Sequence, residues 1–124
     1  MPNWCQNVMY VNHEDNSKVD AIVKELAKGD DAQLFNSLIP NPTGEWDYDW
    51  SVENWGCKWN CDVGDWTRNG DNSISFWFDS PWGPPVNLYE KIENDHDLIV
   101  NAGYHEEGMA FVGRYSEGFD ESYN

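Results

Sequence analysis

The sequence predicts a small α+β protein in which two helices cover one face of an antiparallel sheet, with a long Trp-rich insertion in mid-chain. Three observations lead to this fold class. The chain has 124 residues, close to the usual size of one domain. Hydrophobic residues form 40% of it, which is typical of a globular core. Segments with period-two alternation are interspersed with segments of helical periodicity.

The chain begins with a strand and its clearest helix. Residues 4–11 alternate and are rich in β-forming side chains, which predicts a strand. Asn16 or Ser17 can cap the helix that follows, and Gly29 can end it. The helix itself is predicted by five apolar residues at helical spacing, namely Val19, Ile22, Val23, Leu26 and Ala27.

The middle of the chain is the Trp-rich insertion. The prolines and glycine of residues 40–44 predict a loop, and a short helical turn is expected to end at Gly56. Glycine and proline near three tryptophans suggest tight loops packed on the sheet. We therefore expect these tryptophans to be buried: Trp55, Trp59 and Trp82.

The second half of the chain predicts a hairpin, a helix and two more strands. Residues 61–67 and 73–79 read as strands joined by an Asn69-Gly70 turn. In the second of them, Trp77 lies on the face opposite the run of Ile74, Phe76 and Phe78. The remaining elements are a helix from Pro84-Pro85 to about Asn94 and strands at 98–104 and 109–115.

The element order gives the predicted topology. The order β-α-loop-β-β-α-β-β matches the split βαβ, ferredoxin-like arrangement with one extra C-terminal strand. Residues 1–115 are expected to form this single domain. Residues 116–124 are expected to be a polar, frayed C-terminal tail.

The charge of the chain excludes several classes of partner. Lys and Arg number 7 against 23 Asp and Glu, a formal net charge of −16, and the excess is spread along the chain. Binding to nucleic acid or to an anionic membrane needs Lys and Arg to replace counterions. The sequence therefore predicts no direct nucleic-acid or membrane binding, whereas a basic protein partner is permitted.

The sequence also indicates a cytoplasmic location. No apolar run approaches the ~20 residues of a membrane span, and the N-terminus lacks the basic and hydrophobic regions of a signal peptide. Three cysteines, an odd number, suit a reducing compartment better than a disulfide framework.

Four stretches carry a resemblance to a known family. They are MPNWCQN (1–7), ENWGCKWN (53–60), FDSPWGPP (78–85) and YHEEGMAFVG (104–113). Together they resemble the Api92-like, YubB-type family with a ferredoxin-like domain, which phages and plasmids encode. Cys57 stands where the family usually has Thr, and Gly83 where it has Ser. The resemblance implies a fold and an origin in mobile elements, within the host cytoplasm if phage-encoded, and implies no catalytic residues.

No motif predicts an enzyme, a cofactor or a metal. Cys57 and Cys61 form one C-x3-C pair, whereas structural zinc sites use four ligands in paired short spacings. The run from His105 to Glu107 is expected to lie at a solvated hairpin turn. No nucleophile elbow or phosphate-binding glycine loop is present. We therefore expect no catalytic residues.

Acidic and aromatic residues coincide in one segment, which predicts the binding surface. Exposed carboxylates can imitate phosphates, and Trp and Tyr are frequent interface anchors. The sequence thus favours a non-enzymatic phage or plasmid accessory protein that acts as a host-takeover or anti-defence inhibitor. Its expected partner is a host protein, and a nucleic-acid-binding protein is one candidate. The predicted partner-binding residues are Glu45, Trp46, Asp47, Tyr48, Asp49, Trp50 and Glu53.

Two other hypotheses about the function stay open. One is an enzyme or small-ligand-binding protein with a Trp-lined pocket near the mid-chain loop and His105 or Glu53 as its polar group. The other is a homodimer that pairs through the free sheet face around Trp77.

Overall fold

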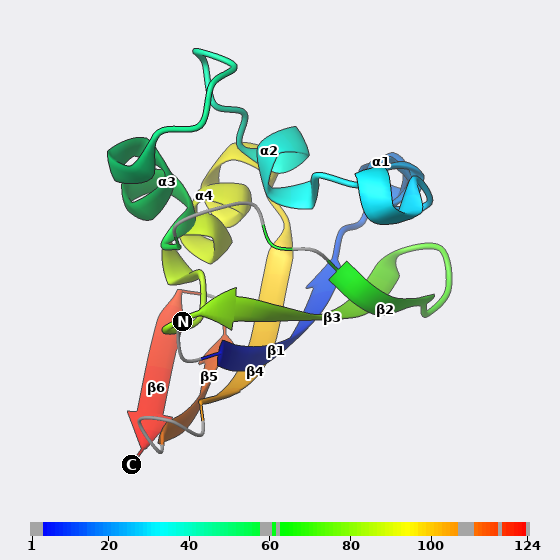
Figure 1. Ribbon diagram of the computed structural model, residues 1–124. Coiled ribbons are helices and arrows are strands. Elements are labelled where there is room, and N and C mark those ends of the chain that lie inside the picture. The colour runs from blue at the N-terminus through cyan, green and yellow to red at the C-terminus, as the bar shows by residue number, and fades with distance from the viewer. Residues whose placement is uncertain (1–3, 58–60, 62, 107–110, 117, 124) are drawn as a thin grey trace.

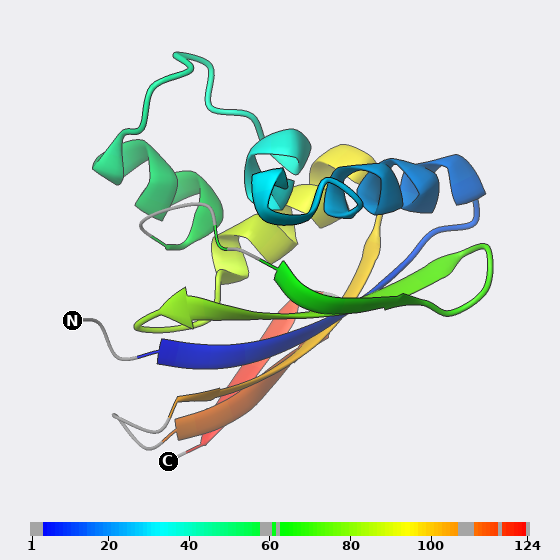
Figure 2. The same ribbon diagram turned by 45° about the vertical axis from the view of Figure 1, so that its right-hand side comes forward.

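The computed structural model describes residues 4–57, 61, 63–106, 111–116 and 118–123. Over these residues the chain forms a six-stranded sheet with helices on one side of it (Figure 1, Figure 2). The strands are β1 Trp4–Asn12, β2 Val63–Arg68, β3 Ser73–Pro81, β4 Ile99–Glu106, β5 Phe111–Ser116 and β6 Phe119–Tyr123. The α-helices are α1 Asn16–Leu26, α2 Leu34–Leu38, α3 Tyr48–Trp55 and α4 Val86–His96, and Gly29–Asp31 forms a 3-10 turn.

The strand order is β2-β3-β1-β4-β5-β6, and every neighbouring pair is antiparallel. This confirms the predicted α+β class with an antiparallel sheet. The C-terminal strand corrects an expectation, because the segment predicted to be a frayed tail contains β6, paired along β5 from Ser116↔Phe119 to Val112↔Tyr123. Gly118, with φ +89°, supplies the left-handed turn that returns the chain.

The α1 helix forms as its periodicity predicts. Val19, Ile22 and Leu26 are buried on one stripe. The cap is Asp15 rather than Asn16 or Ser17: its carboxylate accepts a hydrogen bond from the Ser17 amide at 3.0 Å. That backbone hydrogen bond lowers the pKa of Asp15 below its usual value.

The insertion is fixed to the helix layer through Trp55. The Trp55 ring is buried, meets Phe35 edge-on at 6.1 Å, and donates from Nε1 to the Ile39 carbonyl at 3.0 Å. The expected burial of Trp55 is confirmed. Trp82 was expected to be buried as well, but it is exposed and has a left-handed φ of +70°. Trp59 lies outside the described residues.

The end of α3 rests directly on α4. Gly56 adopts φ +79° at the C-cap, and a Cβ there would lie 3.1 Å from the Asn87 amide nitrogen. The Asn87 side chain donates to the carbonyls of Val52 and Glu53 at 3.2 and 3.1 Å. These contacts determine the orientation of α3.

The buried polar groups at one end of the sheet hold strands together. The Asn7 amide donates to the Cys5 carbonyl at 2.9 Å, the Phe78 carbonyl at 3.2 Å and Ser80 Oγ at 2.9 Å. Glu106, opposite Cys5 in the register, is also buried. Burial and the Glu106 charge raise the pKa of the Cys5 thiol to about 12, so this cysteine is a neutral packing group rather than a nucleophile.

None of the helices formed by the described residues is long and apolar enough to cross a membrane.

Candidate functional site

The structure exposes most of the predicted partner-binding segment. We call it the acidic aromatic surface, comprising Glu45, Trp46, Asp47, Tyr48, Asp49, Trp50 and Glu53. Every member except Trp50 is exposed, with 65% of Trp46 and 49% of Tyr48 accessible to solvent. The segment occupies the loop before α3 and α3 itself, and the loop projects away from the sheet in both views (Figure 1, Figure 2).

Side chains of the loop itself order the projecting segment. Asn41 donates from its amide to the Glu45 carbonyl at 2.7 Å, and the Thr43 hydroxyl donates to the same carbonyl at 3.2 Å. Asp47 caps α3 by accepting a hydrogen bond from the Trp50 amide at 3.1 Å. The aromatic and acidic groups therefore lie on a hydrogen-bonded turn and on the capped first turn of α3. Because this backbone is already ordered, binding a partner costs less conformational entropy.

The α3 helix sorts these side chains into two rows. Residues four apart lie on one side of a helix, so Tyr48 is next to Val52, and Asp49 is next to Glu53. Val52 is exposed and was not among the predicted residues, although its helical spacing from Tyr48 could have indicated it. An apolar row thus runs beside an acidic row.

Trp50 differs from the rest of the predicted set. It is only partly accessible and meets the Trp55 ring edge-on at 5.2 Å. Asn54 donates from its amide to the Trp50 carbonyl at 2.9 Å. Trp50 therefore holds α3 against the core, and its neighbours form the exposed part of the surface.

The carboxylates of this surface are not neutralised by the ion pairs found among the described residues. Those pairs join Lys28 to Glu25, Arg68 to Asp20, and Arg114 to Glu121. The negative potential of the acidic aromatic surface is therefore available to a cationic partner.

The structure places far apart the polar residues that were considered for an enzyme or small-ligand site. His105 is exposed on the sheet face away from the helices, whereas Glu53 lies in the helix layer, so the two cannot share a site. Glu106 was expected at a solvated turn, but β4 continues through it and buries it against β1. Glu107 lies outside the described residues.

The cysteine pair does not make a metal centre with other groups described. Cys57 and Cys61 are both buried, with their sulfur atoms 3.8 Å apart. Over the residues given above, no three His, Cys, Asp or Glu side chains gather closely enough to hold a metal ion.

A hollow of about 470 Å³ lies on the face of the sheet opposite the described helices rather than near the mid-chain loop. No tryptophan lines it, so the expected Trp-lined pocket is not this hollow. Its lining residues come from β1, β4, β5 and β6 and include Val8, Tyr10, Asn101, Gly103, Arg114 and Phe119.

Comparison with known proteins adds one structural likeness. No family model matches the chain, and no curated protein matches it. The chain is similar to the crystal structure of a protein api92 from Yersinia pseudotuberculosis, assigned to the DUF1281 family model, with 24% identity and a TM-score of 0.47. The match covers 75% of this chain and 36% of that chain, so this chain spans little more than a third of that protein. What the comparisons add is therefore a similarity to one Api92-type protein, and they assign no function.

Proposed function

We propose that this protein is a non-enzymatic binding protein that holds a basic protein partner through the acidic aromatic surface. The observation that carries the proposal is that carboxylates and two large exposed aromatic rings coincide on one ordered, projecting segment. The proposal includes an origin in a phage or plasmid, and a host protein that normally binds nucleic acid as the target. Occupying such a target would make the protein a host-takeover or anti-defence inhibitor.

The chemistry of the segment supports different roles for its carboxylates and its aromatic rings. Carboxylates at Glu45, Asp47, Asp49 and Glu53 would occupy positions that phosphates occupy on a cationic target, and would raise the association rate. Trp46 and Tyr48 would bury apolar area and slow dissociation, as interface anchors do.

We also propose that the ferredoxin-like arrangement is the core of this fold. The order β4-β1-β3-β2, with α1 and α4 as the crossover helices, fits a split βαβ unit. In that description β5 and β6 extend the sheet beyond β4.

A charge-neutral variant tests the binding proposal. The variant Glu45→Gln, Asp47→Asn, Asp49→Asn, Glu53→Gln removes four charges, and asparagine at position 47 retains the helix cap. Pull-down from bacterial lysate with the wild type should recover a basic protein whose binding weakens with added salt. The variant should bind that protein at least ~10-fold more weakly, since each charge contributes to steering and contact.

A matched control removes the same number of charges elsewhere: Glu14→Gln, Asp71→Asn, Glu90→Gln and Asp95→Asn, all exposed. It should bind almost as the wild type does. The proposal fails if no partner is recovered, or if binding to the recovered partner ignores both salt and the four substitutions in the acidic aromatic surface.

A further inference from the structure

The sheet has one face that no helix covers among the described residues, which we call the open face (Figure 2). Successive residues of a strand point to opposite faces, so the register assigns each side chain. On β1 the buried residues Cys5, Asn7, Met9 and Val11 point to the helices. The open face therefore receives the alternate positions, among them the five aromatic residues Trp4, Tyr10, Trp77, Phe119 and Tyr123.

The open face is nearly uncharged although the chain is strongly acidic. Over the described residues of β1, β3, β4, β5 and β6, it carries two carboxylates, Asp79 and Glu121, and one guanidinium, Arg114. Aromatic residues and Arg are enriched in the cores of protein interfaces, whereas Lys, Glu and Asp are depleted. The composition is thus that of an interface, and a single Arg is too little for the counterion exchange that nucleic acid requires.

The exposed area is large enough for a dimer. The five aromatic residues are 43–64% exposed. With 150–250 Å² per ring, they present on the order of 500 Å², and Ile99 and Val112 add more. Two such faces together would bury more than ~1,000 Å², the lower limit for a specific interface. A patch of this size is at the upper end for a monomer.

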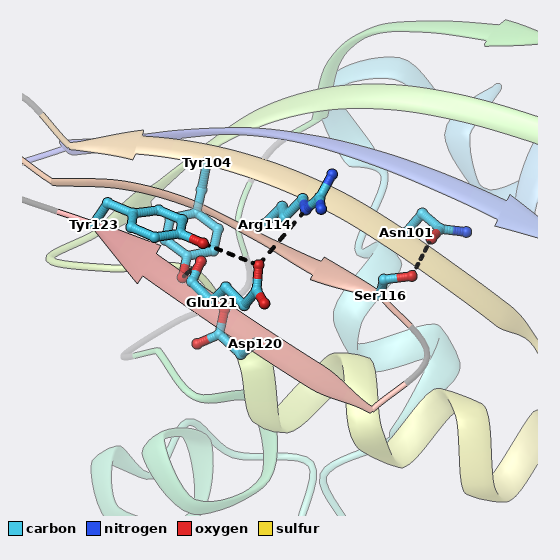
Figure 3. Close-up of polar contacts among 7 residues, drawn as sticks. All are labelled: Asn101, Tyr104, Arg114, Ser116, Asp120, Glu121 and Tyr123. Carbon is cyan, nitrogen blue, oxygen red and sulfur yellow. Dashed lines mark hydrogen bonds and ion pairs between the residues drawn. The ribbon is translucent and has the colours of Figure 1, made fainter.

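The open face is also self-complementary. Arg114 is 77% exposed, and its Nε lies 3.9 Å from Glu121 Oε2, too long for a hydrogen bond (Figure 3). A two-fold axis brings the same patch of two copies together, so Arg114 of each copy can approach Glu121 of the other. The hollow that these two residues line together with Gly103 and Val8 can receive an aromatic ring from the opposing copy.

We propose that the open face is the interface of a symmetric homodimer, packed sheet against sheet. Burial of the aromatic residues drives this association, and the repulsion of two acidic molecules opposes it. The acidic groups of the helices lie on the outside of such a dimer. Because salt screens repulsion between acidic surfaces, association strengthens as salt is added. This is the opposite of the salt dependence expected for a basic partner at the acidic aromatic surface.

Sedimentation velocity on the full chain tests the dimer, from low micromolar to hundred-micromolar protein, at low salt and at roughly 0.5 M NaCl. The wild type should dimerise, and more tightly at high salt. Tyr10→Glu and Trp77→Glu, each on the open face, should weaken dimerisation on the order of 100-fold, because a two-fold axis makes each change act twice. Tyr48→Glu, an equivalent change on α3, should leave dimerisation as in the wild type.

Circular dichroism tests whether each variant is folded. If a variant is not folded, Phe119→Ser on the edge strand takes its place. A wild type that is monomeric at every concentration and salt overturns the proposal. A dimer that persists in the folded open-face variants also overturns it, because another surface must then hold the copies together. A monomer that binds a labelled single-stranded oligonucleotide through Tyr10 and Trp77 assigns the face to nucleic acid instead.

Discussion

Gly113 shows how a single missing side chain allows a contact across three strands. A Cβ at Gly113 would overlap the Glu121 carbonyl and lie 2.5 Å from the Tyr104 ring and hydroxyl. Gly113→Ala is therefore expected to destabilise the fold by about 1–3 kcal/mol, because the crowding involves backbone that cannot move away freely. Urea unfolding measures the effect.

Gly103→Ala is the matched control for that experiment. Its Cβ would meet only Val8 Cγ1, at an ordinary 3.6 Å. The variant should be as stable as the wild type to within ~0.5 kcal/mol. Equal stabilities of the two alanine variants would contradict the account of Gly113.

Residue-level expectations from the sequence fail where a role depends on contacts between distant segments. Trp50 shares its segment with Trp46 and Tyr48, and only the packing of Trp55 determines that Trp50 turns inward. The exposure of the carboxylates was predictable because Asp and Glu are almost never fully buried unless they are paired. The sequence predicted that this segment is exposed, but it did not predict that Trp50 is the ring that packs toward the core.

At the scale of elements, β6 is held to the sheet by a side chain from two strands away. The Tyr104 hydroxyl on β4 donates to Asp120 Oδ1 at 2.6 Å, reaching past Gly113 on β5, in the cluster that Figure 3 shows. Tyr104→Phe should speed amide hydrogen exchange of residues 119–123 about fivefold, since a lost hydrogen bond is worth about 1 kcal/mol.

The exchange experiment has a close control in Tyr123→Phe. The Tyr123 hydroxyl donates to Glu121 Oε2 at 3.2 Å within β6 itself and at the surface. Its removal should leave exchange of β5 and β6 unchanged. If both variants accelerate exchange equally, the bridging role of Tyr104 is wrong.

The elements that the sequence predicted well are those with strong periodicity. β1, α1, β3 and α4 begin and end within about two residues of the expected bounds. The α2 helix was not predicted, because its five residues are too short to show a period. The β6 strand was missed because its apolar residues, Phe119 and Tyr123, flank acidic ones, so its local strand propensity is low. Its pairing with β5 stabilises the strand instead.

For the whole molecule, three tyrosines predict the response to alkaline pH. Burial, aided by the carboxylates of Asp120 and Glu93, raises the pKa of Tyr104 and Tyr115 above the ordinary value, and burial alone is the main cause for Tyr89. The folded state thus retains protons that the unfolded state loses. The contribution of these three tyrosines to stability should be complete below about pH 10, the unfolded tyrosine value, and should fall as pH rises above it.

Urea midpoints measured across that range test the alkaline prediction. The raised pKa of the Cys5 thiol adds a loss in the same direction from about pH 9 upward. The double variant Tyr104→Phe, Tyr115→Phe should start less stable and show a shallower decline. A wild-type midpoint that stays constant well above pH 10 would contradict the prediction.

The two sides of the sheet differ in charge, and this has a consequence for the isolated protein. The chain carries a formal net charge of −16, while the open face holds two carboxylates and one guanidinium over the described residues of β1, β3, β4, β5 and β6. The molecule is therefore an electric dipole whose negative end is the helix layer. On a positively charged support, the monomer, at concentrations too low for it to dimerise, should adsorb through its helix layer, with Tyr10 and Trp77 facing the solvent.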